Sequence, residues 1–215
     1  MARQSTDSPP AESKAQRTRV RILDAAAKVL SVKGYAGTRL TDVAEQAELQ
    51  APAIYYYFKS RDDLIEEVMF CGISDMRHYL QDALDALPDD IDPMDRILAA
   101  VATHLQHELE LSDYARATIR NSGQIPEHLK DRQKKEEAAY NRIWRSLVKN
   151  AAADGHIRSD LDPRLAQALI LGALNWAAEW WDPRRNSVET MVQNAQVFVR
   201  NGLSPNNSPA PRRRR

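Results

Sequence analysis

Apolar residues recur three or four positions apart along most of this 215-residue chain, and no stretch alternates apolar and polar residues as a half-buried strand does. This spacing places apolar side chains on one face of an α-helix. Only seven glycines and eleven prolines interrupt the pattern, so we predict an all-α fold. About nine helices are expected, over residues 14–33, 40–47, 51–57, 61–87, 93–110, 112–121, 127–154, 163–181 and 187–201.

The composition excludes an integral membrane protein. The chain is 43% hydrophobic and 28% charged, which supports a sizeable core but is too polar for a lipid-embedded protein. Its longest uncharged stretch, residues 165–178, is shorter than the roughly 18 residues that span a bilayer. Residues 1–13 hold no apolar signal segment, and the single cysteine, Cys71, cannot form an internal disulfide. A cytoplasmic protein without a membrane partner is expected.

The formal net charge of zero hides an uneven distribution along the chain. Residues 1–65 hold ten basic and eight acidic side chains, whereas residues 66–211 hold sixteen and twenty-two. The last four residues are all arginine. The N-terminal part is therefore the better candidate for an anionic partner, and the acidic remainder is expected to repel nucleic acid.

The charge distribution and the composition divide the chain into four segments. Residues 1–13 and 202–215 have the Ser, Pro, Asn and Arg content of disordered arms. Residues 14–60 are predicted to form a DNA-binding head, and residues 61–201 a helical ligand-binding and dimerisation body. The role of the four terminal arginines stays open.

Residues 14–60 have the layout of a helix-turn-helix: a long helix, a short helix over 40–47, a turn and a second short helix over 51–57. Tyr55 and Phe58 are expected in the core of this head, and Tyr56 and Tyr57 on its exposed side. The other predicted core positions of the two short helices and their turn are Val43, Ala44, Ala47, Leu49 and Ile54. We therefore predict that the head binds double-stranded DNA.

Three runs of residues extend this interpretation: Gly34, Tyr35 and Thr38; then Leu40-Thr41-Asp42-Val43-Ala44; then Ile54-Tyr55-Tyr56-Tyr57-Phe58-Lys59-Ser60-Arg61-Asp62-Asp63-Leu64. In these runs the chain resembles the TetR family of bacterial transcriptional regulators, closely in the N-terminal part and loosely in length and helix count elsewhere. The resemblance implies phosphate contacts by Thr38, Tyr56, Tyr57 and Arg61, and base contacts by Gln50, Ala51, Pro52 and Ala53. Arg39 and Lys59 flank this face and complete the expected DNA-binding set.

The chain departs from the family pattern within the head. Glu48 occupies a turn position where the family usually has glycine, and a left-handed backbone would be strained there. Gln50 and Arg39 replace the usual Ser or Thr helix caps, and Tyr57 replaces a histidine. A poorer cap costs about 1 kcal/mol of local helix stability.

The two C-terminal helices are apolar enough to need a partner. Small residues such as Gly172 permit close helix crossing, so the pair is expected to form half of an intermolecular four-helix bundle with two-fold symmetry. The resemblance implies the same homodimer. The predicted dimer residues are Leu165, Leu169, Gly172, Ala173, Trp176, Met191, Val192, Ala195 and Val199. Burial of both stripes inside the monomer is the alternative.

Polar side chains interspersed among the apolar residues of the body predict a mostly apolar pocket with a few orienting groups. Its expected lining is Phe70, Ile73, Leu105, Tyr114, Tyr140, Trp144, Asn175 and Glu179. Residues 175–183 resemble a segment of TetR-type regulators of fatty-acid and steroid catabolism, some of which respond to acyl-CoA thioesters. Arginine is common there at the position of Glu179, and a carboxylate would repel the phosphates of coenzyme A. A small apolar or amphipathic effector is therefore expected, with acyl-CoA as one candidate.

The sequence offers no set of residues for catalysis, a cofactor or a metal ion. His104 and His107 lie three positions apart, but no third ligand was identified at a useful spacing. We predict a ligand-responsive dimeric transcriptional regulator, most simply a repressor of a palindromic operator. The alternatives are a constitutive or architectural DNA-binding protein and a helical enzyme or protein-interaction module.

Overall fold

The computed structural model describes residues 13–111 and 113–205 and folds them into nine α-helices without a strand in those ranges. These helices are α1 (Lys14–Gly37), α2 (Leu40–Gln46), α3 (Ala51–Ile54), α4 (Arg61–Asp85), α5 (Pro93–Gln106), α6 (Asp113–Asn121), α7 (Asp131–Ala153), α8 (Pro163–Trp180) and α9 (Val188–Leu203). A π-helical turn, η1 (His107–Leu111), and a 3-10 turn, η2 (Glu127–Leu129), lie between them. The all-α prediction is confirmed. Residues 1–12 and 206–215 of the predicted arms lie outside the described residues, and α9 reaches Leu203, beyond the predicted start of the tail.

Capping side chains set the beginnings of most of these helices. Each cap accepts a hydrogen bond from a backbone N–H group of the first helical turn, which otherwise lacks a partner. The caps are Ser13 for α1, Ser60 for α4, Asp92 for α5, Asp162 for α8 and Ser187 for α9. Helix starts are therefore among the features that the sequence predicts well.

Two predicted helices differ from the structure by a turn at one end. Helix α3 ends at Ile54 instead of residue 57, because the chain turns there to place Phe58 in the core of the head. The helix predicted over 127–154 is divided by η2, since the N–H groups of Leu129 and Lys130 donate to carbonyls only three residues earlier. Leu129 is buried at this point, which fixes the turn.

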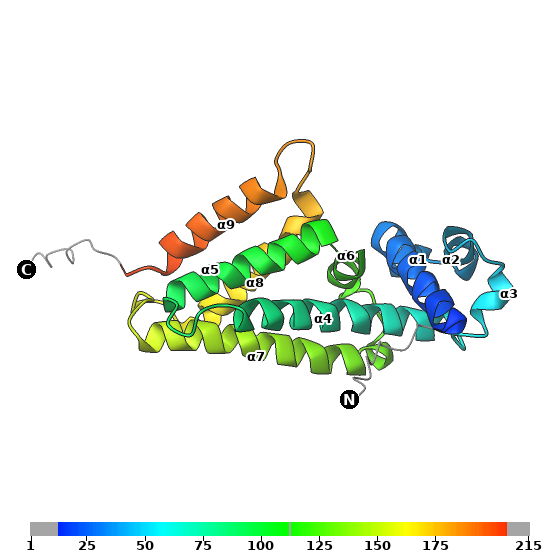
Figure 1. Ribbon diagram of the computed structural model, residues 1–215, viewed down its shortest axis with the longest axis horizontal. Coiled ribbons are helices and arrows are strands. Elements are labelled where there is room, and N and C mark those ends of the chain that lie inside the picture. The colour runs from blue at the N-terminus through cyan, green and yellow to red at the C-terminus, as the bar shows by residue number, and fades with distance from the viewer. Residues whose placement is uncertain (1–12, 112, 206–215) are drawn as a thin grey trace, which may run out of the picture.

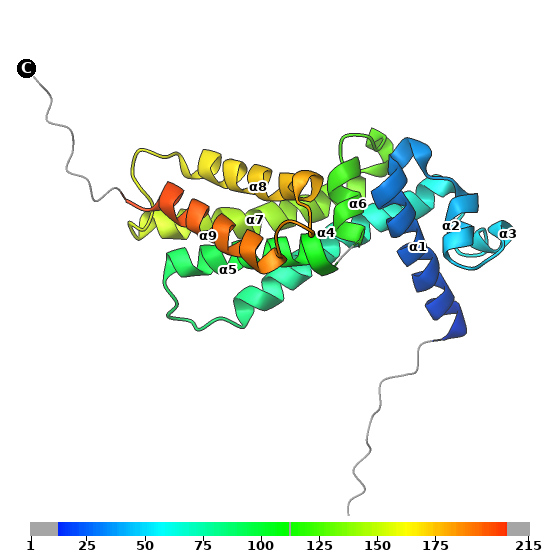
Figure 2. The same ribbon diagram turned by 90° about the horizontal axis from the view of Figure 1, so that it is seen from above.

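The helices form an elongated molecule with the head at one end (Figures 1 and 2). Helix α4 runs from the head into the body beside α7, and α5, α8 and α9 complete the far end. Helix α6 lies against both α1 and α4. At Gly72 of α4 an added Cβ would overlap the Thr118 hydroxyl of α6, so the glycine is needed for this close approach. No helix of residues 13–111 or 113–205 combines the length and apolar character needed to cross a membrane.

The buried apolar residues form two clusters. One fills the body around Trp144, and the other fills the head around Ile22, Leu30 and Ile54. The head cluster also takes in the first turns of α4, the α6 residue Ala117 and the turn η2. The predicted boundary between head and body at residue 60 stays a prediction. The apolar cluster of the head extends across this boundary and so ties the head to α4 and α6.

Candidate nucleic-acid interface and effector cavity

Helix α3 lies at the tip of the head and presents the residues predicted to read bases (Figure 1). Gln50 and Pro52 are exposed, and Ala51 and Ala53 are half-buried. Arg39 and Lys59 are exposed on either side of the helix-turn-helix. These six positions can therefore meet a DNA groove and its phosphates, as a recognition helix requires.

The aromatic residues 55–58 after α3 differ from the prediction in which of them are buried and which are exposed. Tyr56 is 90% exposed, and Phe58 is buried in the head as expected. Tyr55 was expected in the core but is 59% exposed, because the early end of α3 turns it outward. Tyr57 is half-buried and packs against the head core. Tyr56 is thus the freest of the tyrosines to contact a phosphate.

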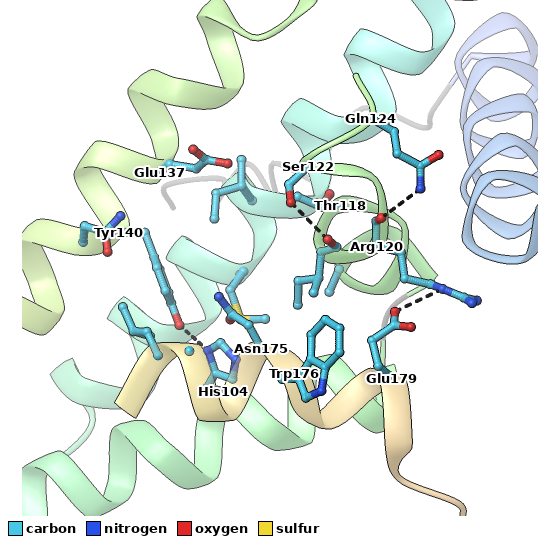
Figure 3. A pocket seen from close by; sticks show the side chains of 18 residues that line it. His104, Thr118, Arg120, Ser122, Gln124, Glu137, Tyr140, Asn175, Trp176 and Glu179 are labelled. Atoms are coloured by element: carbon cyan, nitrogen blue, oxygen red, sulfur yellow. Dashed lines mark hydrogen bonds and ion pairs between the residues drawn. The ribbon is translucent and has the colours of Figure 1, made fainter. Parts of the chain in front are cut away.

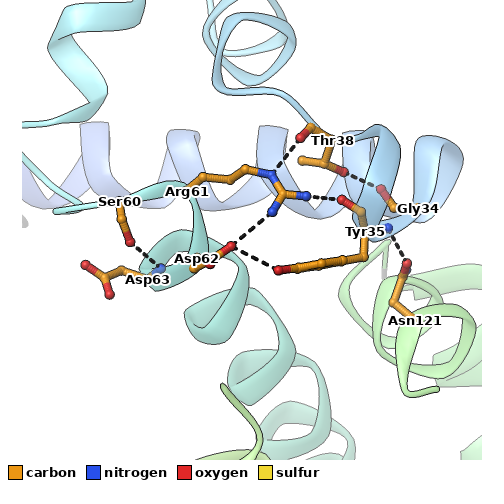
Figure 4. A network of polar contacts seen from close by, with 8 residues as sticks. All are labelled: Gly34, Tyr35, Thr38, Ser60, Arg61, Asp62, Asp63 and Asn121. Atoms are coloured by element: carbon orange, nitrogen blue, oxygen red, sulfur yellow. Dashed lines mark hydrogen bonds and ion pairs between the residues drawn. The ribbon is translucent and has the colours of Figure 1, made fainter. Parts of the chain in front are cut away.

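Thr38 and Arg61 are held inside the head instead of facing a phosphate (Figure 4). Thr38 is buried, and its hydroxyl donates to the Gly34 carbonyl at 2.7 Å. The Arg61 guanidinium donates to the carbonyls of Thr38 and Tyr35 and stacks 4.4 Å from the centroid of the Tyr35 ring. It also pairs with Asp62 at 3.0 Å. The phosphate-contact prediction is therefore wrong for the Thr38 side chain, and Arg61 fastens the start of α4 to the end of α1.

Tyr56→Ala and Gln50→Ala are expected to affect DNA binding in different ways. Loss of the exposed Tyr56 phenol removes a phosphate contact and should weaken binding several-fold to all sequences alike. Loss of Gln50 removes an amide that can pair with a base edge, at about 1–3 kcal/mol of discrimination. Selection of bound sequences from random DNA with both variants measures the contrast. Equal changes of sequence preference in the two variants would contradict the assignment.

Glu48 lies in the turn between α2 and α3 with a left-handed backbone, at a φ of 54°. The turn is closed by the Leu49 N–H, which donates to the Ala44 carbonyl at 2.8 Å. A residue with a Cβ is strained in this conformation, and glycine is not. The departure from glycine at this position therefore has a cost in stability.

Glu48→Gly is expected to raise the free energy of unfolding by about 1 kcal/mol, because it relieves the left-handed strain. Glu48→Ala removes the same carboxylate but keeps a Cβ, so it should not stabilise the protein. Urea unfolding of the two variants beside the wild type compares them. A gain in the alanine variant as large as that in the glycine variant would show that charge, and not backbone strain, is the cause.

The body contains a cavity of about 720 Å³ between α4, α6, α7 and α8 (Figure 3). Apolar walls come from residues such as Ile73, Met76, Leu171 and Trp176. The polar lining includes His104, Thr118, Arg120, Ser122, Gln124, Glu137, Tyr140, Asn141, Asn175 and Glu179. A volume of this size with mixed walls suits a small amphipathic molecule.

Half of the predicted pocket residues line this cavity, namely Ile73, Tyr140, Asn175 and Glu179. The other four do not. Leu105 and Trp144 are fully buried in the body core. The Arg132 guanidinium lies over the Phe70 ring, 3.9 Å from the centroid of that ring. The Tyr114 hydroxyl donates to Asp24 at 2.8 Å and so links α6 to α1. These side chains hold the helices together instead of lining the cavity.

A polar cluster of buried residues forms part of one wall of the cavity. The Tyr140 hydroxyl lies 2.6 Å from Nδ1 of His104. A Glu108 carboxylate oxygen lies 2.9 Å from Nε2 of the same ring. Because a carboxylate only accepts, Nε2–H donates to Glu108, and Nδ1 of the same ring is hydrogen-bonded to the Tyr140 hydroxyl. Burial raises the pKa of the Tyr140 phenol and lowers the pKa of His107 to about 4. Glu108, one helical turn after His104, is the partner that the sequence analysis missed.

Arg120 connects the cavity rim to the head. Its Nη1 donates to the Ser31 carbonyl of α1 at 2.8 Å, and its Nε lies 3.1 Å from the Glu179 carboxylate of α8. Figure 3 shows the pair with Glu179 at the edge of the cavity. The position predicted to repel anions is therefore partnered by a cation, and one side chain contacts both the head and α8.

Asn121, at the end of α6, makes a second connection to α1 (Figure 4). The buried side chain accepts from the Tyr35 N–H at 2.7 Å and donates to the Leu30 carbonyl at 3.3 Å. Both partners flank the kink at Gly34, where φ is 70°. Asn121 therefore ties the end of α6 to the backbone of α1 on both sides of this kink.

One face of α8 is apolar and exposed. Leu165, Leu169 and Trp176 of the predicted dimer stripe are 65%, 72% and 65% exposed, and Gly172 and Ala173 are exposed between them. Trp180 extends the same face at 57%. Monomeric proteins rarely expose a contiguous apolar patch of this kind, so the face is a candidate interface.

The predicted dimer stripe of α9 lies inside the monomer. Val192, Ala195 and Val199 are buried, and Met191 packs against the body core. Their face of α9 lies on α5, where the Gln196 amide donates to the Leu98 carbonyl at 3.0 Å. Val192, Ala195 and Val199 are therefore covered within the monomer, Met191 is half-buried, and α9 exposes Val197 and Phe198 instead.

Two family models match the chain. Residues 22–68 match the one described as bacterial regulatory proteins, tetR family, and residues 90–203 match the one described as tetracyclin repressor-like, C-terminal domain. A curated relative, the HTH-type transcriptional repressor KstR2 of Rhodococcus jostii, is 23% identical over 212 residues. The match covers 93% of this chain and 98% of the relative.

Solved structures share the fold at low sequence identity. AibR in complex with isovaleryl coenzyme A and operator DNA has a TM-score of 0.76 and 16% identity, covering 84% of this chain and 97% of AibR. The regulator FadR of Bacillus subtilis in complex with stearoyl-CoA has a TM-score of 0.70 and 18% identity. That match covers 85% of this chain and 98% of FadR. These likenesses show a shared fold over most of the chain.

Proposed function

The chain belongs to the tetR family of bacterial regulatory proteins, and from this premise we propose that it is a homodimeric repressor released from DNA by an amphipathic effector. The observation that carries the proposal is the position of Arg120, which lines the cavity and donates to the Ser31 carbonyl of the DNA-binding head. A ligand that displaces this side chain acts directly on α1. The cytoplasm is the proposed compartment.

The proposed operator is palindromic, with one half-site for each head. The exposed Gln50 and Pro52 of α3 support base contacts, and the exposed Arg39, Tyr56 and Lys59 support phosphate contacts. A two-fold dimer places two such helices in successive major grooves of one face of the duplex.

The proposed dimer forms through the exposed face of α8. Pairing of this face with its copy removes Leu165, Leu169, Trp176 and Trp180 from water in each subunit. The exposed Val197 and Phe198 of α9 are proposed to extend the interface. Gly172 lets the backbones of the two α8 helices approach closely, since nothing surrounds the position where its Cβ would be.

The proposed effector has an apolar part within the cavity and a polar end at its rim, and acyl thioesters of coenzyme A are the first class to test. The volume and mixed lining of the cavity support an amphipathic ligand. The structures of AibR and FadR hold isovaleryl coenzyme A and stearoyl-CoA. The ion pair of Glu179 with Arg120 offsets the charge that would repel phosphates.

Effector entry is proposed to compete for Arg120. A ligand at the rim separates this side chain from Glu179 or from the Ser31 carbonyl, and α1 then loses one of its attachments to the body. Asn121 carries any displacement of α6 to the backbone of Tyr35. A tenfold loss of operator affinity corresponds to about 1.4 kcal/mol of coupling, and linkage requires an equal loss of effector affinity on DNA.

Selection of bound sequences from random DNA tests the regulator, followed by thermal-shift screening of acyl-CoA thioesters. We expect a palindromic site whose binding weakens steeply with salt. Thermal stabilisation by a ligand that also weakens operator binding supports the effector. Operator binding without any responsive ligand would favour a constitutive DNA-binding protein, and the absence of sequence-specific binding would favour a helical interaction module.

A further inference from the structure

A second hollow adjoins the cavity. It has a volume of about 590 Å³ and lies between α7 and α8. Its lining includes Asn141, Leu171, Gly172 and Asn175, all of which also line the cavity. The two hollows are therefore contiguous, and we call the second one the arginine groove. Its remaining lining residues are Arg145, Arg164, Gln167 and Ala168.

The arginine groove is positively charged. Arg145 comes from α7 and Arg164 from α8, and the groove lining contains no carboxylate. Within the described part of the chain neither guanidinium forms an ion pair or a hydrogen bond, although the backbone N–H of Arg164 donates to Asp162. Elsewhere on the body, Arg120 and Arg132 each pair with a carboxylate. The two groove arginines thus keep their donors available for a ligand.

Amide groups add further hydrogen-bonding capacity between the two arginines. Gln167, which lines the groove, is a buried residue. Its Nε2 donates to the carbonyl and the side-chain oxygen of Asn141 over long distances of 3.4 Å each. Asn175 lies where the groove meets the cavity. The Asn175 amide and two guanidinium groups offer several donors, which suits the several oxygens of a phosphate.

We propose that the arginine groove binds the phosphate-bearing end of a ligand whose apolar chain lies in the cavity. This subsite rests on the proposed function, because it completes the effector site. It defines the ligand class as a phosphate or pyrophosphate ester joined to an apolar chain. Recognition of the anion takes place at Arg145 and Arg164, on the other side of Asn175 from the Arg120 and Glu179 pair.

Matched amphiphiles test the subsite by calorimetric titration of the full chain. Dodecanol, dodecanoate, dodecyl phosphate and dodecanoyl coenzyme A share a chain length, and the last two supply phosphate from different sources. We expect both phosphate-bearing ligands to bind about tenfold more tightly than the alcohol, because charge-assisted hydrogen bonds are the strong ones. Arg145→Gln/Arg164→Gln should remove this preference and leave the affinity for dodecanol unchanged.

Further variants separate the subsite from general effects of charge and from effects on α8. Lys135→Gln/Arg142→Gln removes the same charge from α7 outside the groove and should keep the preference. Arg145→Gln changes only α7 and should lose part of the preference for phosphate-bearing ligands. Arg145→Lys/Arg164→Lys keeps both charges and should retain part of the preference that the double glutamine variant loses.

Equal wild-type affinity for the alcohol and the phosphates would overturn the subsite but leave the cavity and the regulator standing. Loss of the preference in the Lys135 and Arg142 control would overturn it as well. The absence of binding by all four amphiphiles would instead overturn the proposed effector, and the subsite with it.

Discussion

Leu169→Asp is expected to convert the protein to monomers and to abolish operator binding at concentrations that saturate the wild type. Leu169 is 72% exposed in the middle of the apolar face of α8. In a two-fold interface each subunit would place a new carboxylate in an apolar contact, and an unpaired buried charge costs several kcal/mol. A monomer presents one recognition helix to DNA, so affinity should fall by roughly 10² to 10⁴ through lost avidity.

Analytical ultracentrifugation and operator titration measure the two effects separately. Val32→Asp is the matched control, because Val32 is 67% exposed on α1 and lies outside the α8 face. This control should stay dimeric. A dimeric Leu169→Asp variant would contradict the proposed interface.

Arg120→Ala is expected to keep operator binding and effector binding but to lose most of the coupling between them. Arg120 joins the cavity rim, α8 and the head through Glu179 and the Ser31 carbonyl. Coupling free energies are typically about 1–3 kcal/mol, or 5–150-fold in affinity. We expect the ratio of operator affinities without and with the effector to fall close to one.

The fold should survive this substitution, because an ion pair this exposed contributes about 0–1 kcal/mol. Arg116→Ala is the control on the same helix. Arg116 pairs with Asp113 at 3.8 Å, and among the described residues no hydrogen bond or ion pair joins its side chain to α1, so its loss should leave the coupling intact. Equal loss of coupling in both variants would show that α6 stability, and not the Arg120 contact, sets the response.

Local sequence signals predicted most of the fold. The apolar spacing identified the helices, and in the structure the caps Ser60, Asp92 and Asp162 stand at three of the predicted starts. The early end of α3 escaped prediction because burial of Phe58 in the head decides where the chain turns. Helix ends that depend on tertiary packing are not encoded in local spacing.

The site residues were harder to predict, because an apolar stripe shows that a face is buried but not what covers it. The stripe of α9 that includes Val192 lies on α5 of the same chain, whereas the stripe of α8 that includes Leu169 is exposed. Large apolar side chains such as Trp144 fill the core, and the cavity depends on where the packing leaves space. Arg120 carried no sequence signal, since its partners are distant in the chain.

Operator affinity of the wild-type protein, measured with and without a ligand shown to occupy the cavity, tests the central claim most directly. A selected operator duplex is titrated in the absence of ligand and then at a saturating concentration of an acyl-CoA. The account predicts at least tenfold weaker operator binding in the presence of the ligand, about 1.4 kcal/mol of coupling. Unchanged operator affinity with the cavity fully occupied would contradict it.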